Sequence, residues 1–120
     1  MINTAQALYD FWSGFGIPAY TTVTVPDDAE LPFITYSLTE TEPLQPMTHY
    51  ANVYYRATDN ARLVAKVDEI KAAFGTDKKV TLKCEGGYVV LRAPKVQIQT
   101  DQSPENRFAY IDMQINCYHE

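Results

Sequence analysis

The segment from residue 107 to residue 118 constrains the fold more than any other part of this sequence, because its side chains alternate strictly between two kinds. Every second position is apolar, in the series Ala109, Ile111, Met113, Ile115 and Cys117. The positions between them are aromatic or polar, in the series Phe108, Tyr110, Asp112, Gln114 and Asn116. A period of two residues places one face of a β-strand against a core. The chain must therefore cover one face of a sheet with its remaining elements.

Two segments have the apolar spacing of the helices that could supply this cover. In residues 4–14, Leu8 and Trp12 belong to an apolar series at helical spacing, and we expect Trp12 in the core between helix and sheet. Residues 60–74 carry a longer apolar stripe, formed by Leu63, Val64, Val67, Ile70 and Phe74. Asp59 or Asn60 is expected to cap this second helix, and Gly75 to end it in a left-handed conformation.

The other segments are typical of strands. Before the second helix we expect strands over residues 19–25, 32–42 and 49–56. After it we expect a hairpin over residues 80–92 around Gly86-Gly87, a short strand over residues 94–100 and the terminal strand. The sequence thus predicts an α+β fold, with a mostly antiparallel or mixed β-sheet and two α-helices packed on one face. With 120 residues, 46% of them hydrophobic, we expect one domain over residues 1–120.

Charge is divided unevenly along the chain. The first 55 residues contain no Lys or Arg but several acids, among them Asp27, Asp28, Glu30, Glu40 and Glu42. The strand-rich part that follows the second helix carries Lys78, Lys79, Lys83 and Arg92. A domain with an acidic and a basic part is a candidate for head-to-tail contact between copies, which is how rings arise. A solvated hairpin face is the alternative explanation of the basic set.

The sequence lacks the motifs that are typical of catalytic, metal-binding and nucleic-acid-binding sites. Net charge is −5, which opposes binding to phosphate backbones, so we expect no specific nucleic-acid binding. His49 is expected to be solvated or to contact another subunit rather than to catalyse, and the serines lack a nucleophile motif. Cys84 and Cys117 have no metal-ligand spacing, so we expect two reduced, partly buried thiols and neither metal nor cofactor. The sequence shows no long apolar run and no signal peptide at its start, so a membrane partner is not expected and the chain should stay in a cytoplasm.

Tyrosine is unusually frequent, with nine in the chain. Among those that fall in expected strands are Tyr36, Tyr50, Tyr54, Tyr55, Tyr88, Tyr110 and Tyr118. Two explanations stay open. The rings could form aromatic pairs across the strands of a one-sided sheet, or part of the sheet could be an assembly interface.

Several stretches together carry a resemblance to a known family. These are the aromatic start ALYDFW, the strand PFITYSLTETEP, the strand–helix pair VYYRATDNARLVAKVDEIKAAFG and the terminal strand RFAYIDMQINCY. With this arrangement the chain resembles the tail terminator or tail-completion proteins of long-tailed bacteriophages, a group that includes minor capsid and head–tail joining proteins.

The resemblance implies a non-enzymatic virion protein that forms a hexameric ring of about six copies. Such a ring caps the head-proximal end of the tail tube, stops its polymerisation and docks on the head connector, so the tail tube protein and connector proteins are the implied partners. Asp27, Asp28, Glu30, Glu40 and Glu42 would then lie at the interface or line a lumen through which DNA passes, and Lys78, Lys79, Lys83 and Arg92 would form the opposing patch.

Two alternatives remain at this point. The first is a head-completion or neck protein, which docks to the portal instead of the tail tube. The second is a small ligand-binding α+β domain, which would need a concave site with convergent polar groups.

Overall fold

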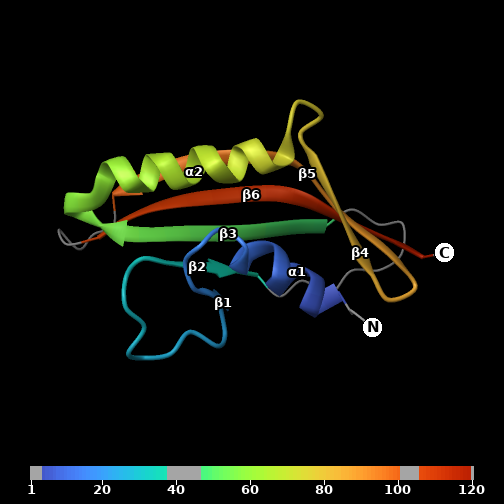
Figure 1. Ribbon diagram of the computed structural model, residues 1–120, viewed down its shortest axis with the longest axis horizontal. Coiled ribbons are helices and arrows are strands. Elements are labelled where there is room, and N and C mark those ends of the chain that lie inside the picture. Colours follow the sequence, from blue (N-terminus) through green and yellow to red (C-terminus); the bar gives the residue numbers. More distant parts are fainter. Residues whose placement is uncertain (1–3, 38–46, 101–105, 120) are drawn as a thin grey trace.

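The computed structural model describes residues 4–37, 47–100 and 106–119. In chain order the elements are α1 (Thr4–Ser13), β1 (Ala19–Thr21), β2 (Phe33–Tyr36), β3 (Met47–Arg56), a 3-10 turn (Ala57–Asp59), α2 (Asn60–Phe74), β4 (Lys79–Cys84), β5 (Gly87–Thr100) and β6 (Asn106–His119). The described strands form one six-stranded sheet in the order β1-β2-β3-β6-β5-β4. β1 and β2 are parallel and the other neighbours are antiparallel. Both helices lie on the same side of this sheet (Figure 1), so the predicted α+β class is confirmed.

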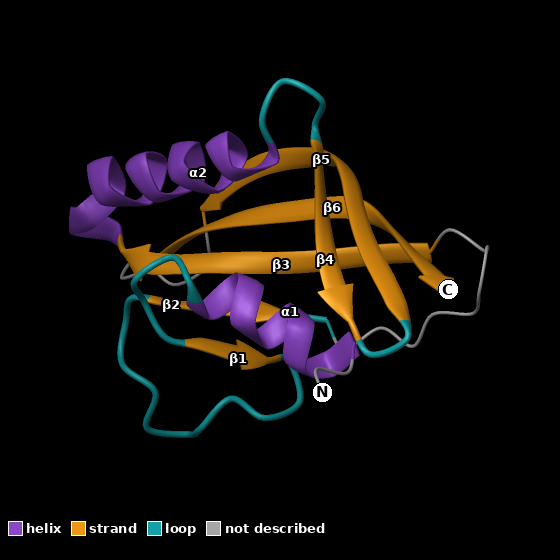
Figure 2. Cartoon of the chain, turned by 45° about the vertical axis from the view of Figure 1, so that its right-hand side comes forward, coloured by secondary structure: helices purple, strands orange, loops and turns teal. Residues whose placement is uncertain are grey.

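The core lies between the helices and the sheet. The apolar series of β6 faces it, and all five of its members are buried: Ala109, Ile111, Met113, Ile115 and Cys117. β6 lies between β3 and β5, so these side chains occupy the middle of the sheet. The alternation in the sequence therefore predicted the buried face of this strand correctly. The sheet is strongly curved (Figure 2). Its edge strand β4 passes across α1 and contacts it.

Each helix buries one stripe. α1 buries Ala7, Leu8 and Trp12, and α2 buries Leu63, Val67, Ile70 and Phe74. Val64 was expected in the second stripe, but it is exposed, because it lies just beyond the edge of the buried face of α2. The rings of Phe11 and Phe74 meet edge to face, with centroids 5.9 Å apart, and join the two helices.

Polar interactions of Lys66 also stabilise the contact between α2 and the segment that follows α1. The Nζ of Lys66 on α2 donates to the backbone oxygen of Phe15 at 2.5 Å. The same ammonium group pairs with Glu69 at 2.9 Å. The chain that leaves α1 is therefore held against α2 by a charged hydrogen bond as well as by aromatic contacts.

Several expected boundaries differ from the structure. The strand expected over 19–25 ends at Thr21, because the amide of Thr24 bonds back to the oxygen of Thr21 and turns the chain. Of the strand expected over 32–42, β2 covers Phe33–Tyr36, and residues 38–42 lie outside the described residues. Asp59 precedes α2 without a side-chain capping bond, since the 3-10 turn leads directly into the helix.

The strand expected over 94–100 is the second half of β5 rather than a separate element. β5 pairs with β6 on both sides of a register shift between Arg92 and Lys95. Pro94 lies within this shift, where its lack of an amide proton breaks no ladder bond. The hairpin before it is as expected: Cys84 pairs with Gly87, and Gly86 has a φ of 77° in the turn.

Candidate assembly surfaces

The acidic loop, residues 22–32, connects β1 to β2 at one edge of the sheet. Asp27, Asp28 and Glu30 are all exposed on it. The chain turns here through a bond from the amide of Ala29 to the oxygen of Pro26 at 3.1 Å. Within the described part of the chain, none of the three acids forms an ion pair. Glu40 and Glu42 of the predicted acidic set lie outside the described residues.

The predicted basic residues lie on or beside β4, which forms the opposite edge of the sheet. We call this set, Lys78, Lys79, Lys83 and Arg92, the basic edge. Lys79 lies directly opposite Arg92 in the β4–β5 ladder, so two like charges face each other across the strands. Like charges in this position destabilise a sheet unless an anion compensates them. Lys78 precedes β4 and Lys83 lies near its other end, so the structure brings only part of the set together.

Arg92 is the least exposed member of the basic edge. Its Nη2 donates to the hydroxyl of Tyr118 at 3.1 Å. Its Nε is buried and has no hydrogen-bond partner among the residues that the structure describes. A buried guanidinium N–H without an acceptor is costly, and among the described residues no carboxylate pairs with Arg92.

The acidic loop and the basic edge are far apart in one molecule. They belong to the first and last strands of the sheet order, and Figure 1 shows the loop at the lower left and the α2–β4 turn at the upper right. The molecule extends 47 × 32 × 22 Å along its principal axes. The two surfaces can therefore meet only between copies.

The α2–β4 turn has an unusual backbone. Lys78 has a φ of 54° and Ala93, in the bulge of β5, has a φ of 56°. The amide of Ala93 donates to the oxygen of Lys78 at 2.9 Å, which ties the turn to the bulge. This left-handed conformation costs a residue with a Cβ about 1–2 kcal/mol. The fold thus holds two non-glycine residues in a conformation that glycine adopts more easily.

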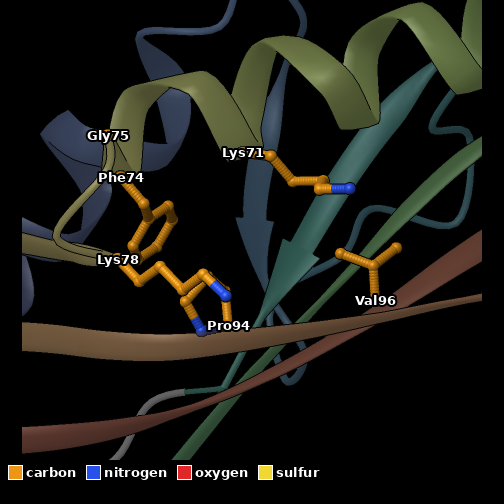
Figure 3. Close-up of a pocket in the computed structure, with 6 residues that line it drawn as sticks. All are labelled: Lys71, Phe74, Gly75, Lys78, Pro94 and Val96. Carbon is orange, nitrogen blue, oxygen red and sulfur yellow. The ribbon is translucent and has the colours of Figure 1, made fainter.

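Beside this turn the surface is hollowed into a groove of about 350 Å³ (Figure 3). The groove is lined by Lys71, Phe74, Gly75, Lys78, Pro94 and Val96. Lys71 belongs to α2 and was not among the residues singled out from the sequence. The groove depends on the bulge that brings Pro94 next to the helix end, and only Pro94 itself marks that bulge in the sequence.

The structure contradicts the expectation from the sequence for His49. It was expected at the surface, but its side chain is fully buried on β3 beneath α1. Trp12 Nε1 donates to its Nε2 at 3.0 Å, and Ser37 Oγ lies 3.0 Å from its Nδ1. The indole of Trp12 is a donor only, so the proton of the neutral imidazole is on Nδ1 and points to Ser37. Burial lowers the pKa of His49 from 6.5 to about 4.

This geometry excludes one chemistry. A histidine that activates a serine must accept the proton of the hydroxyl. Here Nδ1 donates to Ser37, whose Oγ also accepts from the amide of Tyr50 at 3.0 Å. His49 therefore holds α1 on the sheet and does not activate Ser37.

Both cysteines are free, and both are buried, whereas the sequence predicted partly buried thiols. Burial raises the pKa of the Cys84 thiol, which lowers its reactivity. Within residues 4–37, 47–100 and 106–119, no group of His, Cys, Asp and Glu side chains has an arrangement that could hold a metal ion. The helices of this same part are too short or too polar to cross a membrane.

The sheet face away from the helices carries a row of aromatic rings. Successive centroids from Tyr20 through Phe33 and Tyr54 to Phe108 are 6.0, 5.1 and 5.5 Å apart, across β1, β2, β3 and β6. The expectation of cross-strand aromatic pairs is thus confirmed for these strands. The alternative, that the same face is an assembly interface, stays a prediction.

Comparison with known proteins shows the fold and no family. No protein-family model matches the chain, and no curated protein matches it. Nine chains of solved structures match. One of them superposes with a TM-score of 0.65 at 14% sequence identity, over 96% of this chain and 90% of its own length, and its name states no function. At that identity the match supports the fold alone.

Proposed function

We propose that this chain is a structural protein of a bacteriophage or prophage virion that caps the head-proximal end of the tail tube. In this role it ends polymerisation of the tube and forms a ring that joins tail to head. Subunits assemble in the cytoplasm of the bacterial host and remain in the neck region of the virion. The resemblance of the sequence to tail terminator proteins supports the proposal, and the arrangement of charge supports it independently.

The observation that carries the proposal is the position of the acidic loop and the basic edge at opposite edges of the sheet. A closed ring uses a heterologous contact, in which two different patches of each subunit meet. This chain offers two patches of opposite sign that cannot reach each other within one molecule. Loop acids that do not take part in the contact would face the lumen, where they repel phosphates and let DNA pass without binding.

Tail morphology tests the proposal directly. The gene is deleted from the phage or prophage that encodes it, and the particles are examined by negative-stain electron microscopy. Overlong tails without heads are the expected result, because tube polymerisation is no longer stopped. Normal tails beside unjoined heads would support the head-completion or neck role instead. Normal virions would contradict both roles and favour the ligand-binding alternative.

The mass in solution tests the ring. Light scattering over a wide range of protein and salt concentrations is expected to detect a species of about six subunits that salt dissociates, since exposed charges are screened. A species whose mass does not respond to salt would contradict a contact made by the charged surfaces.

A further inference from the structure

The groove beside the α2–β4 turn joins two ammonium groups to an apolar floor (Figure 3). Lys71 reaches over it from α2, and Lys78 lies alongside Pro94 at its rim. Phe74, Pro94 and Val96 supply the apolar surface. A segment that fits such a surface carries two carboxylates together with short apolar side chains.

The backbone of the groove is fixed. Lys78 has a left-handed φ, and its carbonyl is held by the amide of Ala93. Its own amide donates to the oxygen of Gly75 at 3.3 Å, which closes the turn. Strained residues of this kind persist where the surrounding structure forces them, and they cluster at binding sites. The rim of the groove is therefore organised before any partner arrives.

A segment with the matching chemistry exists in the same chain. The acidic loop presents Asp27 and Asp28 in sequence, both exposed, and the partly buried Ala29 and Leu31 flank Glu30. Among the described residues these acids have no cationic partner. The loop lies at the opposite edge of the sheet from the groove, so it cannot enter the groove of its own molecule.

We infer that the groove is the docking site for the acidic loop of a neighbouring copy, with Lys71 and Lys78 meeting Asp27 and Asp28. The inference rests on the proposed ring, and it assigns the residues of its subunit contact. Exposed ion pairs contribute little in water. Here the apolar floor excludes water from one side of each pair, and several charges act together, so reversal of one charge weakens the contact by about tenfold.

The test is sedimentation velocity of the full chain at low salt, with charge-reversed variants. Lys71→Glu is compared with Arg62→Glu, because both residues are exposed on α2 and the change in charge is the same, but only Lys71 lines the groove. Asp28→Lys probes the loop. We expect Lys71→Glu and Asp28→Lys each to weaken association about tenfold, and Arg62→Glu to leave it within about twofold. The Lys71→Glu/Asp28→Lys double variant is expected to recover most of the loss.

The Lys78→Gly variant tests whether loss of folding, rather than loss of charge, explains weaker association. Glycine relieves the left-handed backbone, so this variant loses the ammonium group without loss of stability. Its association is expected to fall as that of Lys71→Glu does.

Three outcomes would overturn the inference. The first is association unchanged by Lys71→Glu and Lys78→Gly. The second is association weakened by the groove variants but not by Asp28→Lys, which would mean that another segment occupies the groove. The third is a wild-type chain that stays monomeric at every concentration. None of these three outcomes tests the proposed function. That function is tested separately, by the tail lengths of the deletion phage.

Discussion

Lowering the pH from 7 to 5 is expected to destabilise this fold by about 2 kcal/mol through one residue, His49. Its imidazole is fully buried between α1 and the sheet, with a neighbour within hydrogen-bond distance of each nitrogen. Protonation would place a charge in the core. It would also leave Trp12, which can only donate, facing a second donor at Nε2.

The sign and size follow from the two pKa values of this group. Burial lowers the pKa of His49 from 6.5 to about 4 in the folded state. Between these values the unfolded chain binds a proton and the folded chain does not, so a falling pH favours unfolding. The stabilisation is complete above about pH 6.5 and is lost as the pH falls toward about 4, for a total of about 3 kcal/mol. About 2 kcal/mol of it is lost between pH 7 and pH 5.

Urea denaturation at pH 7 and pH 5 measures this loss. The wild-type midpoint is expected to fall by about 1 M over this range. His49→Gln can still accept from Trp12 but does not titrate, so its midpoint should change much less. His119→Gln, which removes the other histidine of the sequence, is the control and should behave as the wild type does.

Two results would refute the reasoning. One is a His49→Gln variant that loses as much stability as the wild type between the two pH values. The other is an NMR titration in which the imidazole of His49 protonates near pH 6.5 while the chain remains folded.

Three further predictions concern stability, each measured as the free energy of unfolding in urea. Lys78→Gly should leave it unchanged or raise it by up to about 1 kcal/mol by relieving the left-handed backbone, and a loss above this size would show that the turn is not strained. Trp12→Phe should lower it by about 2–4 kcal/mol, because His49 loses its donor and the core gains a cavity, and a smaller loss than about 1 kcal/mol would contradict the described contact. Ile111→Ala, in the middle of the buried face, should lower the free energy of unfolding by about 2–5 kcal/mol. Ile98→Ala changes a side chain that is 48% exposed, so it should lower this free energy by less than about 1 kcal/mol. Equal losses for the two variants would contradict the assigned faces of the sheet.

Periodicity in the sequence predicted the regular elements well. The alternation over residues 107–118 identified the buried face of β6, and the apolar stripe over residues 60–74 identified α2 with its bounds. It overestimated β1, because the turn closed by Thr24 depends on a local hydrogen bond that apolar patterns do not reveal.

Contacts between distant segments could not be read from the sequence. His49 looked like a surface residue at the start of a strand, and its burial is possible because Trp12 and Ser37, from other segments, satisfy its two ring nitrogens. The division of charge along the chain was visible, but its placement at opposite edges follows from the strand order. The groove at Lys78 likewise depends on a bulge some fifteen residues further along, at Ala93.

The central place of β6 also has a consequence for synthesis on the ribosome. β6 is the most C-terminal strand of the sheet, yet it lies between β3 and β5 and joins the half formed by β1, β2 and β3 to the hairpin of β4 and β5. Until residues 106–119 have emerged, these two halves have no ladder between them, and the long-range pairing that defines the sheet cannot begin. A nascent or truncated chain therefore cannot hold its acidic loop and its basic edge at a fixed separation. In the proposed ring, only a subunit with β6 in place would present both surfaces to its neighbours.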